Sequence, residues 1–394
     1  MIQTKGQWGS SKLDEIATIE RESISPTNIK NGTQYVGLEH MTSEGMLVDV
    51  KTVSVGELAS NKFLFGPQHI LYGKLRPYLK KTTLPNFEGV CSTDILPIRP
   101  SKEMDKRFLY YFLRQQHVVD LATQRCTGAN LPRLSPKLLA KFVVPVPPIK
   151  EQRRIADILE KADLIRRKRG SLVSNFQELN SSLFHERFGD ASTNVKQWNV
   201  VKFRELFSAS PNYGTMIKPS DDTGDWLDLR VANIQNGKID LTSKKYVELP
   251  LNMIKRHEVK DGDLLLARAI GSLHHLGKCI VAQPGGELWA FDSHLMRIRF
   301  DSSKVLPLYV HAFLVSPGGR HEFLKNSRRS AVQFNINTKE IGKIKIPLPP
   351  IQEQVKFIAE LQDVKRMAKR HEVAALESEN LFNSLVQLAF KGEL

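Results

Sequence analysis

The chain contains nearly the same eight-residue segment twice, 202 residues apart. Residues 145–152 read PVPPIKEQ and residues 347–354 read PLPPIQEQ. The register continues without a gap, because Leu183 recurs as Leu385. An internal repeat over a long span is the sequence signature of one structural plan that is built more than once. The sequence therefore predicts two copies of one plan within 394 residues.

Each copy begins with a mixed region of strands and helices. Short apolar runs such as residues 90–98 lie among Gly, Pro and Asn turn signals, which is typical of strands. Apolar residues at helical spacing occur at residues 106–116 and again at residues 308–315. We predict an α/β (α+β) fold with two pseudo-repeated globular domains, residues 1–148 and residues 191–350.

A long helix is expected after each globular domain. Pro148 and Pro350 can begin a helix, because the missing N–H of proline costs nothing in the first helical turn. The segments that follow, residues 149–190 and residues 351–394, contain no proline and are charged and periodic. We predict one long helix over each segment, and a helix of about 40 residues spans about 60 Å.

Both predicted helices carry apolar residues at alternating steps of three and four, the pattern of a coiled coil. The predicted contact positions are Ile155, Ile158, Ala162, Ile165, Leu172, Phe176, Leu179 and Leu183 in the first helix, and Phe357, Val364, Met367, Ala374, Leu381, Leu385 and Leu388 in the second. The matching stripes predict an antiparallel helix pair that separates the two domains. The alternative is that each helix packs only on its own domain.

The charge of the chain points to an anionic partner. Lys and Arg number 57 against 42 Asp and Glu, so the formal net charge is +15. No run of 18 apolar residues predicts a membrane span, and the first ten residues lack an apolar signal core. The three cysteines form no CxxC pair, which argues against a disulfide framework or a zinc ribbon. These features favour a nucleic-acid-binding protein of the cytoplasm.

Several short motifs resemble catalytic or metal sites but miss a required residue. Residues 271–279 place five residues between two glycines where a phosphate loop needs four, and Cys279 stands where Ser or Thr holds magnesium. His321 and His371 begin zincin-like helices that lack the second histidine ligand. We therefore expect no catalytic residue, no metal site and no cofactor in this chain.

Basic loops recur at matching places in the two copies. Residues 73–81 correspond to residues 268–278, and residues 125–137 correspond to residues 328–339. Lysine and arginine neutralise phosphates, and arginine, asparagine and glutamine can also read base edges. The alternative is that these segments are ordinary solvated loops. The predicted DNA contacts are Lys74, Arg76, Tyr78, Lys80, Lys81, Arg125, Asn130, Arg133, Tyr213, Lys218, Arg268, His274, His275, Lys278, Arg328, Arg329, Gln333 and Asn335.

Two variable regions, each closed by Pro-x-Pro-Pro-Ile-x-Glu-Gln and a long helix, resemble the specificity subunit of type I restriction-modification systems. The resemblance covers essentially the whole chain. It implies two target-recognition domains on an antiparallel helix pair. Each domain would read one half of a bipartite DNA target, and the helices would set the spacer. The subunit would not itself be catalytic.

The same resemblance implies partners and their cofactors. Two modification subunits would methylate DNA with S-adenosylmethionine, and restriction subunits would use ATP and magnesium to translocate and cleave it. The residues that match the motif for helix packing and subunit docking are Pro147, Pro148, Ile149, Glu151, Gln152, Pro349, Pro350, Ile351, Glu353 and Gln354. The rival hypothesis is a coiled-coil scaffold that binds protein partners and has sequence-blind affinity for DNA. A nuclease with a scattered metal site is a third.

Overall fold

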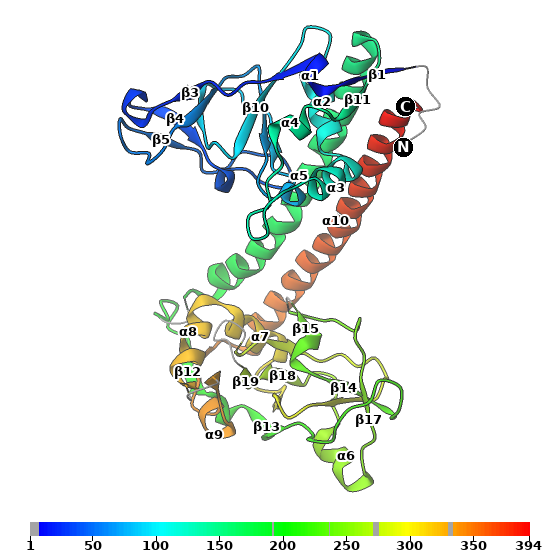
Figure 1. Cartoon of the computed structure of the whole chain (residues 1–394). Coiled ribbons are helices and arrows are strands. Elements are labelled where there is room, and N and C mark those ends of the chain that lie inside the picture. Colours follow the sequence, from blue (N-terminus) through cyan, green and yellow to red (C-terminus); the bar gives the residue numbers. More distant parts are fainter. Residues whose placement is uncertain (1–7, 191–192, 236, 271–275, 330–333) are drawn as a thin grey trace. The chain divides into compact units, whose positions relative to one another are not determined.

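The computed structural model describes the chain except for residues 1–7, 191–192, 236, 271–275 and 330–333, and except for the side chains of residues 177, 178, 180, 181, 270, 329 and 334. The chain forms two compact units, residues 1–171 with 372–394 and residues 172–371. Two long helices, α5 (Ile149–Phe188) and α10 (Ile351–Lys391), contribute to both units. The predicted mixed fold with two long helices is confirmed (Figure 1).

The first unit is built on two sheets that are mainly antiparallel. The strand orders are β2-β10-β7-β8 and β3-β6-β9-β4-β5, and the parallel pair in the second sheet is β4 with β9. These strands are β2 (Ala17–Ile19), β3 (Ser23–Ile24), β4 (Thr33–Val36), β5 (Lys51–Val53), β6 (Lys62–Phe65), β7 (Ile70–Gly73), β8 (Thr82–Thr83), β9 (Gly89–Cys91) and β10 (Ile95–Pro100).

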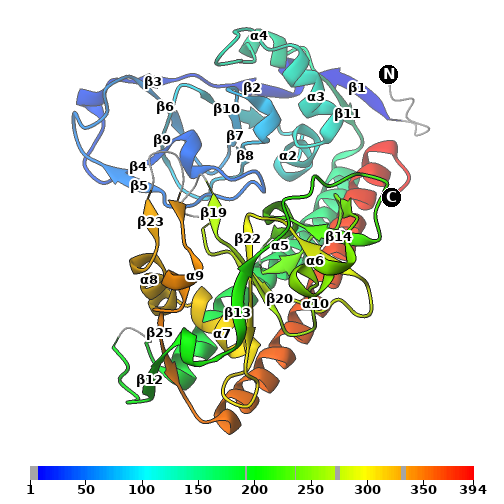
Figure 2. The same ribbon diagram turned by 90° about the horizontal axis from the view of Figure 1, so that it is seen from below.

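Helices cover one face of the sheet that contains β10 (Figure 2). Asp105 caps α2 (Lys106–Leu113) by accepting hydrogen bonds from the N–H groups of Arg107 and Phe108, at 2.9 and 3.1 Å. Ile155 from α5 and Phe390 from α10 join the same core, so both long helices are part of this unit's interior. The shorter helices are α1 (Leu13–Ile16), α2 (Lys106–Leu113), α3 (Gln116–Gln124) and α4 (Pro136–Leu139), with the 3-10 turns η1 (Pro26–Asn28), η2 (Leu38–His40) and η3 (Pro77–Leu79).

The second unit repeats this plan. Its sheets have the orders β13-β22-β18-β20 and β17-β14-β21, and β14 and β21 run parallel as β4 and β9 do. The strands are β13 (Phe207–Tyr213), β14 (Trp226–Leu229), β15 (Ile234–Gln235), β16 (Lys238–Ile239), β17 (Tyr246–Val247), β18 (Leu264–Ala267), β19 (Ala269–Ile270), β20 (Cys279–Val281), β21 (Trp289–Phe291), β22 (Leu295–Phe300), β23 (Arg328–Arg329) and β24 (Phe334–Asn335).

The core of the second unit contains a cluster of aromatic side chains among aliphatic ones. Phe184 and Phe188 of α5, Phe357 of α10 and Tyr309 form a cluster of edge-on and tilted rings. Such ring pairs stabilise a core beyond their buried area. The shorter helices are α6 (Leu251–His257), α7 (Pro307–Val315), α8 (Pro317–Lys325) and α9 (Thr338–Ile341), with η4 (Phe203–Glu205) and η5 (Val231–Asn233).

Each globular region is closed by the pairing of its own first and last strands. In the first unit β1 (Gly9–Lys12) pairs antiparallel with β11 (Val143–Val146), which leads directly into α5. In the second unit β12 (Asn199–Lys202) pairs antiparallel with β25 (Lys345–Leu348), which leads directly into α10. The Pro-Pro motif therefore stands between the closing strand and the long helix in both copies.

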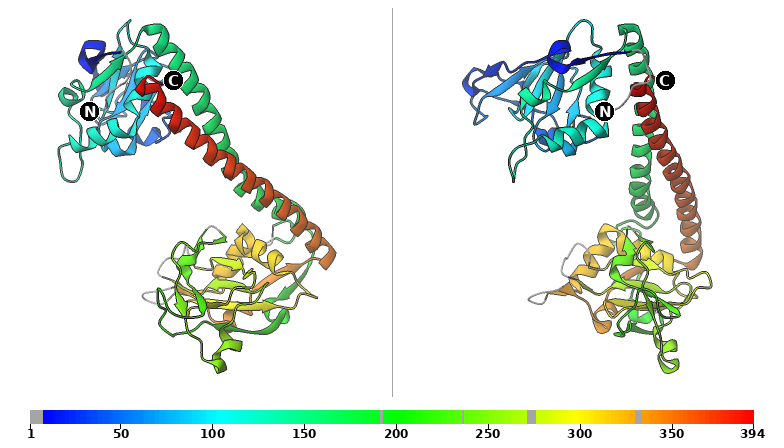
Figure 3. Two further views of the ribbon diagram at one scale, coloured as in Figure 1. Left: turned by 90° about the vertical axis from the view of Figure 1, so that its right-hand side faces the viewer. Right: turned by 45° about the vertical axis from the view of Figure 1, so that its right-hand side comes forward.

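The long helices pair antiparallel in each unit (Figure 3). In the first unit Arg169 Nη1 donates to the carbonyl of Ala374 at 2.9 Å, and Arg166 pairs with Glu379 at 3.0 Å. In the second unit Arg187 lies 3.2 Å from Glu353. Within the first unit, earlier residues of α5 meet later residues of α10, as the predicted antiparallel arrangement requires.

The predicted contact positions on these helices are partly wrong. Six of them are 37–58% exposed, namely Ile165, Leu172, Leu179, Met367, Leu381 and Leu388. The contact face instead contains buried polar residues, including Asp163 and Ser378, each 5% exposed. In several turns the contact face lies one position away from the predicted apolar stripe. The reason is that polar side chains that bind one another fill part of this face.

None of the helices in the described part of the chain combines the length and apolar character needed to cross a membrane.

Candidate nucleic-acid interface

Two predicted DNA-binding loops of the first unit come together in the structure. The backbone N–H of Arg76 donates to the carbonyl of Pro132 at 2.8 Å, and that of Leu134 donates to Lys74 at 2.9 Å. Arg76 Nη2 also lies 3.4 Å from the carbonyl of Asn130. Segments more than fifty residues apart thus form one surface with several cations.

The first of these loops has an unusual backbone. Arg76 and Lys80 adopt the left-handed conformation, with φ of 51° and 53°, on either side of η3. Non-glycine residues rarely occupy this region, and they concentrate at functional sites. Tyr78, between them, is 50% exposed. Lys81 behaves differently, since its Nζ donates to the carbonyl of Leu38 at 2.6 Å within the domain.

A carboxylate lies between two of the predicted cations. Arg133 donates from Nε and Nη2 to the two carboxylate oxygens of Asp94, at 2.9 and 3.0 Å. Lys74 Nζ lies 3.8 Å from the same side chain. The hydrogen bond from Arg133 lowers the pKa of Asp94 below its usual value. Asp94 was not among the predicted site residues. It directly precedes a strand, and the second copy has a residue at the corresponding position.

The corresponding loops of the second unit also come together. The N–H of Ile336 donates to the carbonyl of Arg268 at 3.0 Å, and β19 pairs with β24. The guanidinium of Arg268 lies 4.1 Å from the ring centre of Tyr213 and donates to the carbonyl of Ser293. Arg328 pairs with the buried Glu340. The structure therefore gathers Arg268, Tyr213 and the β23–β24 ribbon at one place.

The two surfaces match position by position. The N–H of Lys74 donates to the carbonyl of Asp94 at 2.9 Å, and the N–H of Arg268 donates to His294 at 2.9 Å. Leu134 and Ile336, which follow Arg133 and Asn335, bind the carbonyls of Lys74 and Arg268 in the same way. Lys74, Asp94 and Arg133 thus correspond to Arg268, His294 and Asn335.

Other predicted contacts lie elsewhere or outside the described part. Arg125 stacks on the ring of Phe142 at 5.5 Å, on its own domain. Lys218 is exposed after β13, and Lys278 is half-buried beside the start of β20. His274, His275 and Gln333 lie outside the described residues, as does the side chain of Arg329.

The glutamines of the repeated motif connect each closing strand to its globular region. Gln152 donates to the carbonyl of Pro147 at 2.8 Å and accepts from the N–H of Asp105 at 2.8 Å. Gln354 donates to Pro349 at 2.9 Å and accepts from Leu306 at 2.9 Å. Both glutamines are fully buried, so these side chains serve packing within their own unit.

The other motif residues reach the surface to different extents. The first proline of each pair, Pro147 or Pro349, is buried, and the second, Pro148 or Pro350, is exposed. Ile149, Glu151, Ile351 and Glu353 are half-buried in the first helical turn. Glu151 binds Arg154, and Glu353 binds Lys356 and Arg187.

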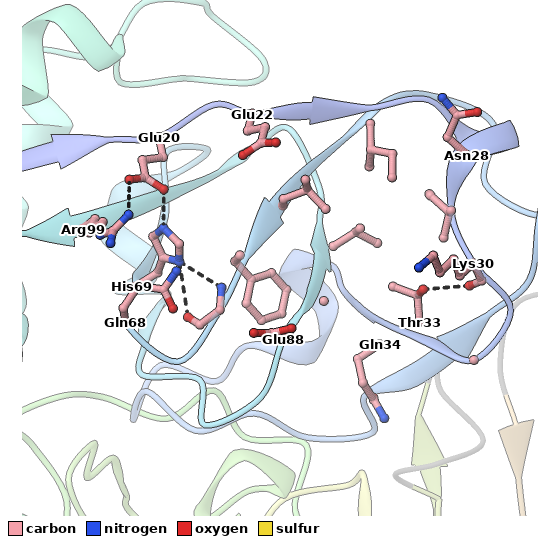
Figure 4. Close-up of a pocket in the computed structure, with 18 residues that line it drawn as sticks. Glu20, Glu22, Asn28, Lys30, Thr33, Gln34, Gln68, His69, Glu88 and Arg99 are labelled. Atoms are coloured by element: carbon pink, nitrogen blue, oxygen red, sulfur yellow. Dashed lines mark hydrogen bonds and ion pairs between the residues drawn. The ribbon is translucent and has the colours of Figure 1, made fainter.

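A separate hollow of about 640 Å³ lies between strands of the first unit (Figure 4). Its acidic side chains are Glu20, Glu22 and Glu88. Glu20 accepts from His69 Nε2 at 2.8 Å and pairs with Arg99 at 3.3 Å, and the hydrogen bond from His69 lowers the pKa of Glu20. Three carboxylates make this hollow a poor site for a phosphate backbone.

Among the described residues there is no group of three His, Cys, Asp or Glu side chains arranged to hold a metal ion. The basic double-loop surfaces are therefore the strongest candidate sites on the described parts of both units.

Comparison with known proteins identifies the family. The model of the type I restriction modification DNA specificity domain matches twice, over residues 5–170 and residues 195–377. The chain belongs to this family. Each match covers one globular region and part of a long helix.

Individual members of the type I specificity family are distant in sequence but similar in fold. The EcoKI specificity subunit of Escherichia coli K12 is 26% identical over 317 residues, which cover 75% of this chain and 67% of that subunit. The solved S subunit from M. genitalium has a TM-score of 0.60 at 14% identity, covering 99% of this chain and 98% of its own. A chain from a structural study of type I complex assembly and conformational transition has a TM-score of 0.62 at 19% identity, with both chains fully covered.

Proposed function

We propose that this chain is the DNA-recognition subunit of a type I restriction-modification complex. Each globular region binds one half of a bipartite target, and the two long helices set the spacing between the halves. The observation that carries the proposal is the matched pair of double-loop surfaces. Both copies use the same backbone contacts to bring two loops together, but present different side chains, as two unlike half-sites require.

The proposal assigns the chemistry to other subunits. Two modification subunits bind S-adenosylmethionine and methylate the target, and restriction subunits use ATP and magnesium. This chain is not catalytic, binds no cofactor and works in the cytoplasm on double-stranded DNA. The exposed Pro148 and Pro350, with the first turns of α5 and α10, are proposed to dock the modification subunits. The names of three curated relatives, each a specificity subunit of a type I restriction enzyme, support this division of labour.

A map of methylated adenines tests the proposal. The map is made by single-molecule sequencing of cells that express the modification subunit with or without this chain. We expect one split motif with a fixed gap to be methylated only when the chain is present. Methylation that does not depend on the chain would contradict the proposal.

The net charge of +15 also favours a second candidate, a coiled-coil scaffold that binds DNA without sequence preference. Measuring which duplexes the protein binds from a random pool distinguishes the two functions. A scaffold would bind all duplexes with equal affinity and strong salt dependence, whereas a recognition subunit with its partners would select a split motif from a random pool.

A further inference from the structure

We infer that Arg133, held by Asp94, reads a guanine in the half-site bound by the first unit. The inference rests on the proposed function and extends it to one side chain and one base. Three observations carry it, namely the geometry of the ion pair, its net charge and the matched position in the second unit.

The ion pair fixes the direction of the Arg133 guanidinium. Its backbone is held in the loop, because Arg133 and Thr127 exchange N–H to carbonyl hydrogen bonds at 2.9 and 3.1 Å. Asp94 accepts hydrogen bonds from Nε and Nη2 of Arg133. Nη1 makes one weak contact with the carbonyl of Leu131 at 3.4 Å. Arginine has five donors, so two N–H groups remain on the outer edge. Two parallel donors match O6 and N7 of guanine.

The net charge of the pair argues for a base rather than a phosphate. Asp94 is ionised at neutral pH, since Arg133 lowers its pKa. The carboxylate therefore offsets the charge of Arg133 itself and leaves the direction of its free N–H groups unchanged, while Lys74, 3.8 Å from the same carboxylate, remains as a cation beside the pair. Arg133 is 41% exposed and Asp94 is 22% exposed, so the pair lies at the surface where a base edge can approach. A side chain held in one direction also loses less conformational entropy on binding.

The second unit carries a different reader at the same position. Asn335 corresponds to Arg133, and His294 corresponds to Asp94. An asparagine amide can donate and accept at once, which matches adenine and not guanine. The matched position therefore differs between the units in the way that two unlike half-sites require.

The experiment uses the full chain with its modification subunit and compares methylated motifs by single-molecule sequencing. Arg133→Met keeps a long side chain but loses every donor, and Asp94→Asn loosens the ion pair. For both variants we expect the methylated motif to tolerate any base at one guanine position of one half-site. The preference for guanine at that position should fall roughly tenfold or more. The other half-site and the gap should stay unchanged. Arg99→Met is the matched control, because Arg99 pairs with Glu20 at the far end of β10.

A second readout separates base reading from phosphate binding and from misfolding. Binding of random-pool duplexes by the purified complex is measured between low and high potassium chloride. Arg133→Ala should leave the salt dependence unchanged while the guanine preference disappears. Equal loss on all duplexes with a shallower salt dependence would overturn the inference, as would an unchanged motif for Arg133→Met. If the unaltered chain directs no split motif, the proposed function itself fails.

Discussion

Asp163 accepts a hydrogen bond from Arg166 at 2.7 Å on the face of α5 that meets α10. Arg167 binds the same carboxylate, and Arg166 also donates a hydrogen bond to Glu379 of α10 at 3.0 Å. Asp163 is 5% exposed. The helix contact of the first unit therefore contains a charged layer where coiled coils usually carry apolar side chains.

Asp163→Ala is expected to destabilise the first unit strongly. The change removes the carboxylate that Arg166 and Arg167 share. The side chains of both arginines are less than a third exposed, so water replaces the carboxylate only in part. Removing one partner of a buried pair costs about 3–5 kcal/mol, and because Arg166 keeps its contact with Glu379 we expect the lower end of this range. The free energy of unfolding in denaturant measures the effect. Asp363→Ala is the control, because Asp363 pairs with Arg366 at an exposed position and should cost less than about 1 kcal/mol. Equal effects of both changes would contradict the prediction.

Gln152→Ala should lower the free energy of unfolding by about 3 kcal/mol, because buried hydrogen-bonding groups are left unpaired. Those groups are the N–H of Asp105 and the carbonyls of Pro147 and Glu103. Chemical denaturation with tryptophan fluorescence provides the measurement. Gln116→Ala changes an exposed glutamine of the same unit and should have little effect. A Gln152 variant as stable as this control would show that the buried amide is dispensable.

Asp228 is expected to make the second unit less stable as pH rises. It is 1% exposed, and no hydrogen bond to either carboxylate oxygen is found among the described residues. Burial and the nearby Asp292 raise its pKa from 3.8 to about 7, against the opposing charge of Arg230. Between these values the folded state binds more protons than the unfolded state. The free energy of unfolding therefore falls from about pH 4 to pH 7 and is then constant.

Asp228→Asn removes this titration and should stabilise the protein at pH 8 by roughly 4 kcal/mol, with little change at pH 4. Denaturation curves for the variant and the unaltered chain at several pH values provide the comparison. Asp225→Asn, three residues earlier and exposed, is the control and should not alter the pH dependence. A constant difference between Asp228→Asn and the unaltered chain across the pH range would rule out the raised pKa.

Lys80→Asn should weaken binding to all DNA sequences alike. Asparagine removes the charge and tolerates the left-handed backbone of this position. Loss of one phosphate contact reduces the slope of log affinity against log salt by about one. Titration at several potassium chloride concentrations measures the slope. Lys102→Asn, an exposed lysine beyond the opposite end of β10, should leave the slope unchanged. A selective loss on one target sequence would instead make Lys80 a base reader.

The long helices were predictable because their signals are local. A Pro-Pro pair followed by a charged, periodic segment without proline indicates a helix start, and α5 and α10 begin at Ile149 and Ile351. The contact face was less predictable, because periodicity assigns Ile165 and Met367 to the interior on hydrophobicity alone. The structure buries Asp163 and leaves Ile165 half-exposed. A charged residue that is buried because it binds neighbouring arginines has no hydrophobic signal.

The double-loop surfaces were predictable only in part. The internal repeat placed Lys74 and Arg268 at corresponding positions, and the structure brings their loops together with the next basic loop of each copy. The role of Asp94 was not visible, because an acidic residue gives no signal in a search for DNA-binding cations. Its importance depends on a contact with Arg133, 39 residues later, which only the folded chain makes.

The pairing of β1 with β11 and of β12 with β25 has a consequence for how such a protein can change. Each globular region begins and ends on neighbouring strands, so its chain enters and leaves at one place. A foreign region with the same two closing strands can then replace it by recombination at the flanking repeats, if it also accepts Ile155 and Phe390 or their counterparts in its core. Exchange of whole modules would thus supply a new half-site in one genetic event.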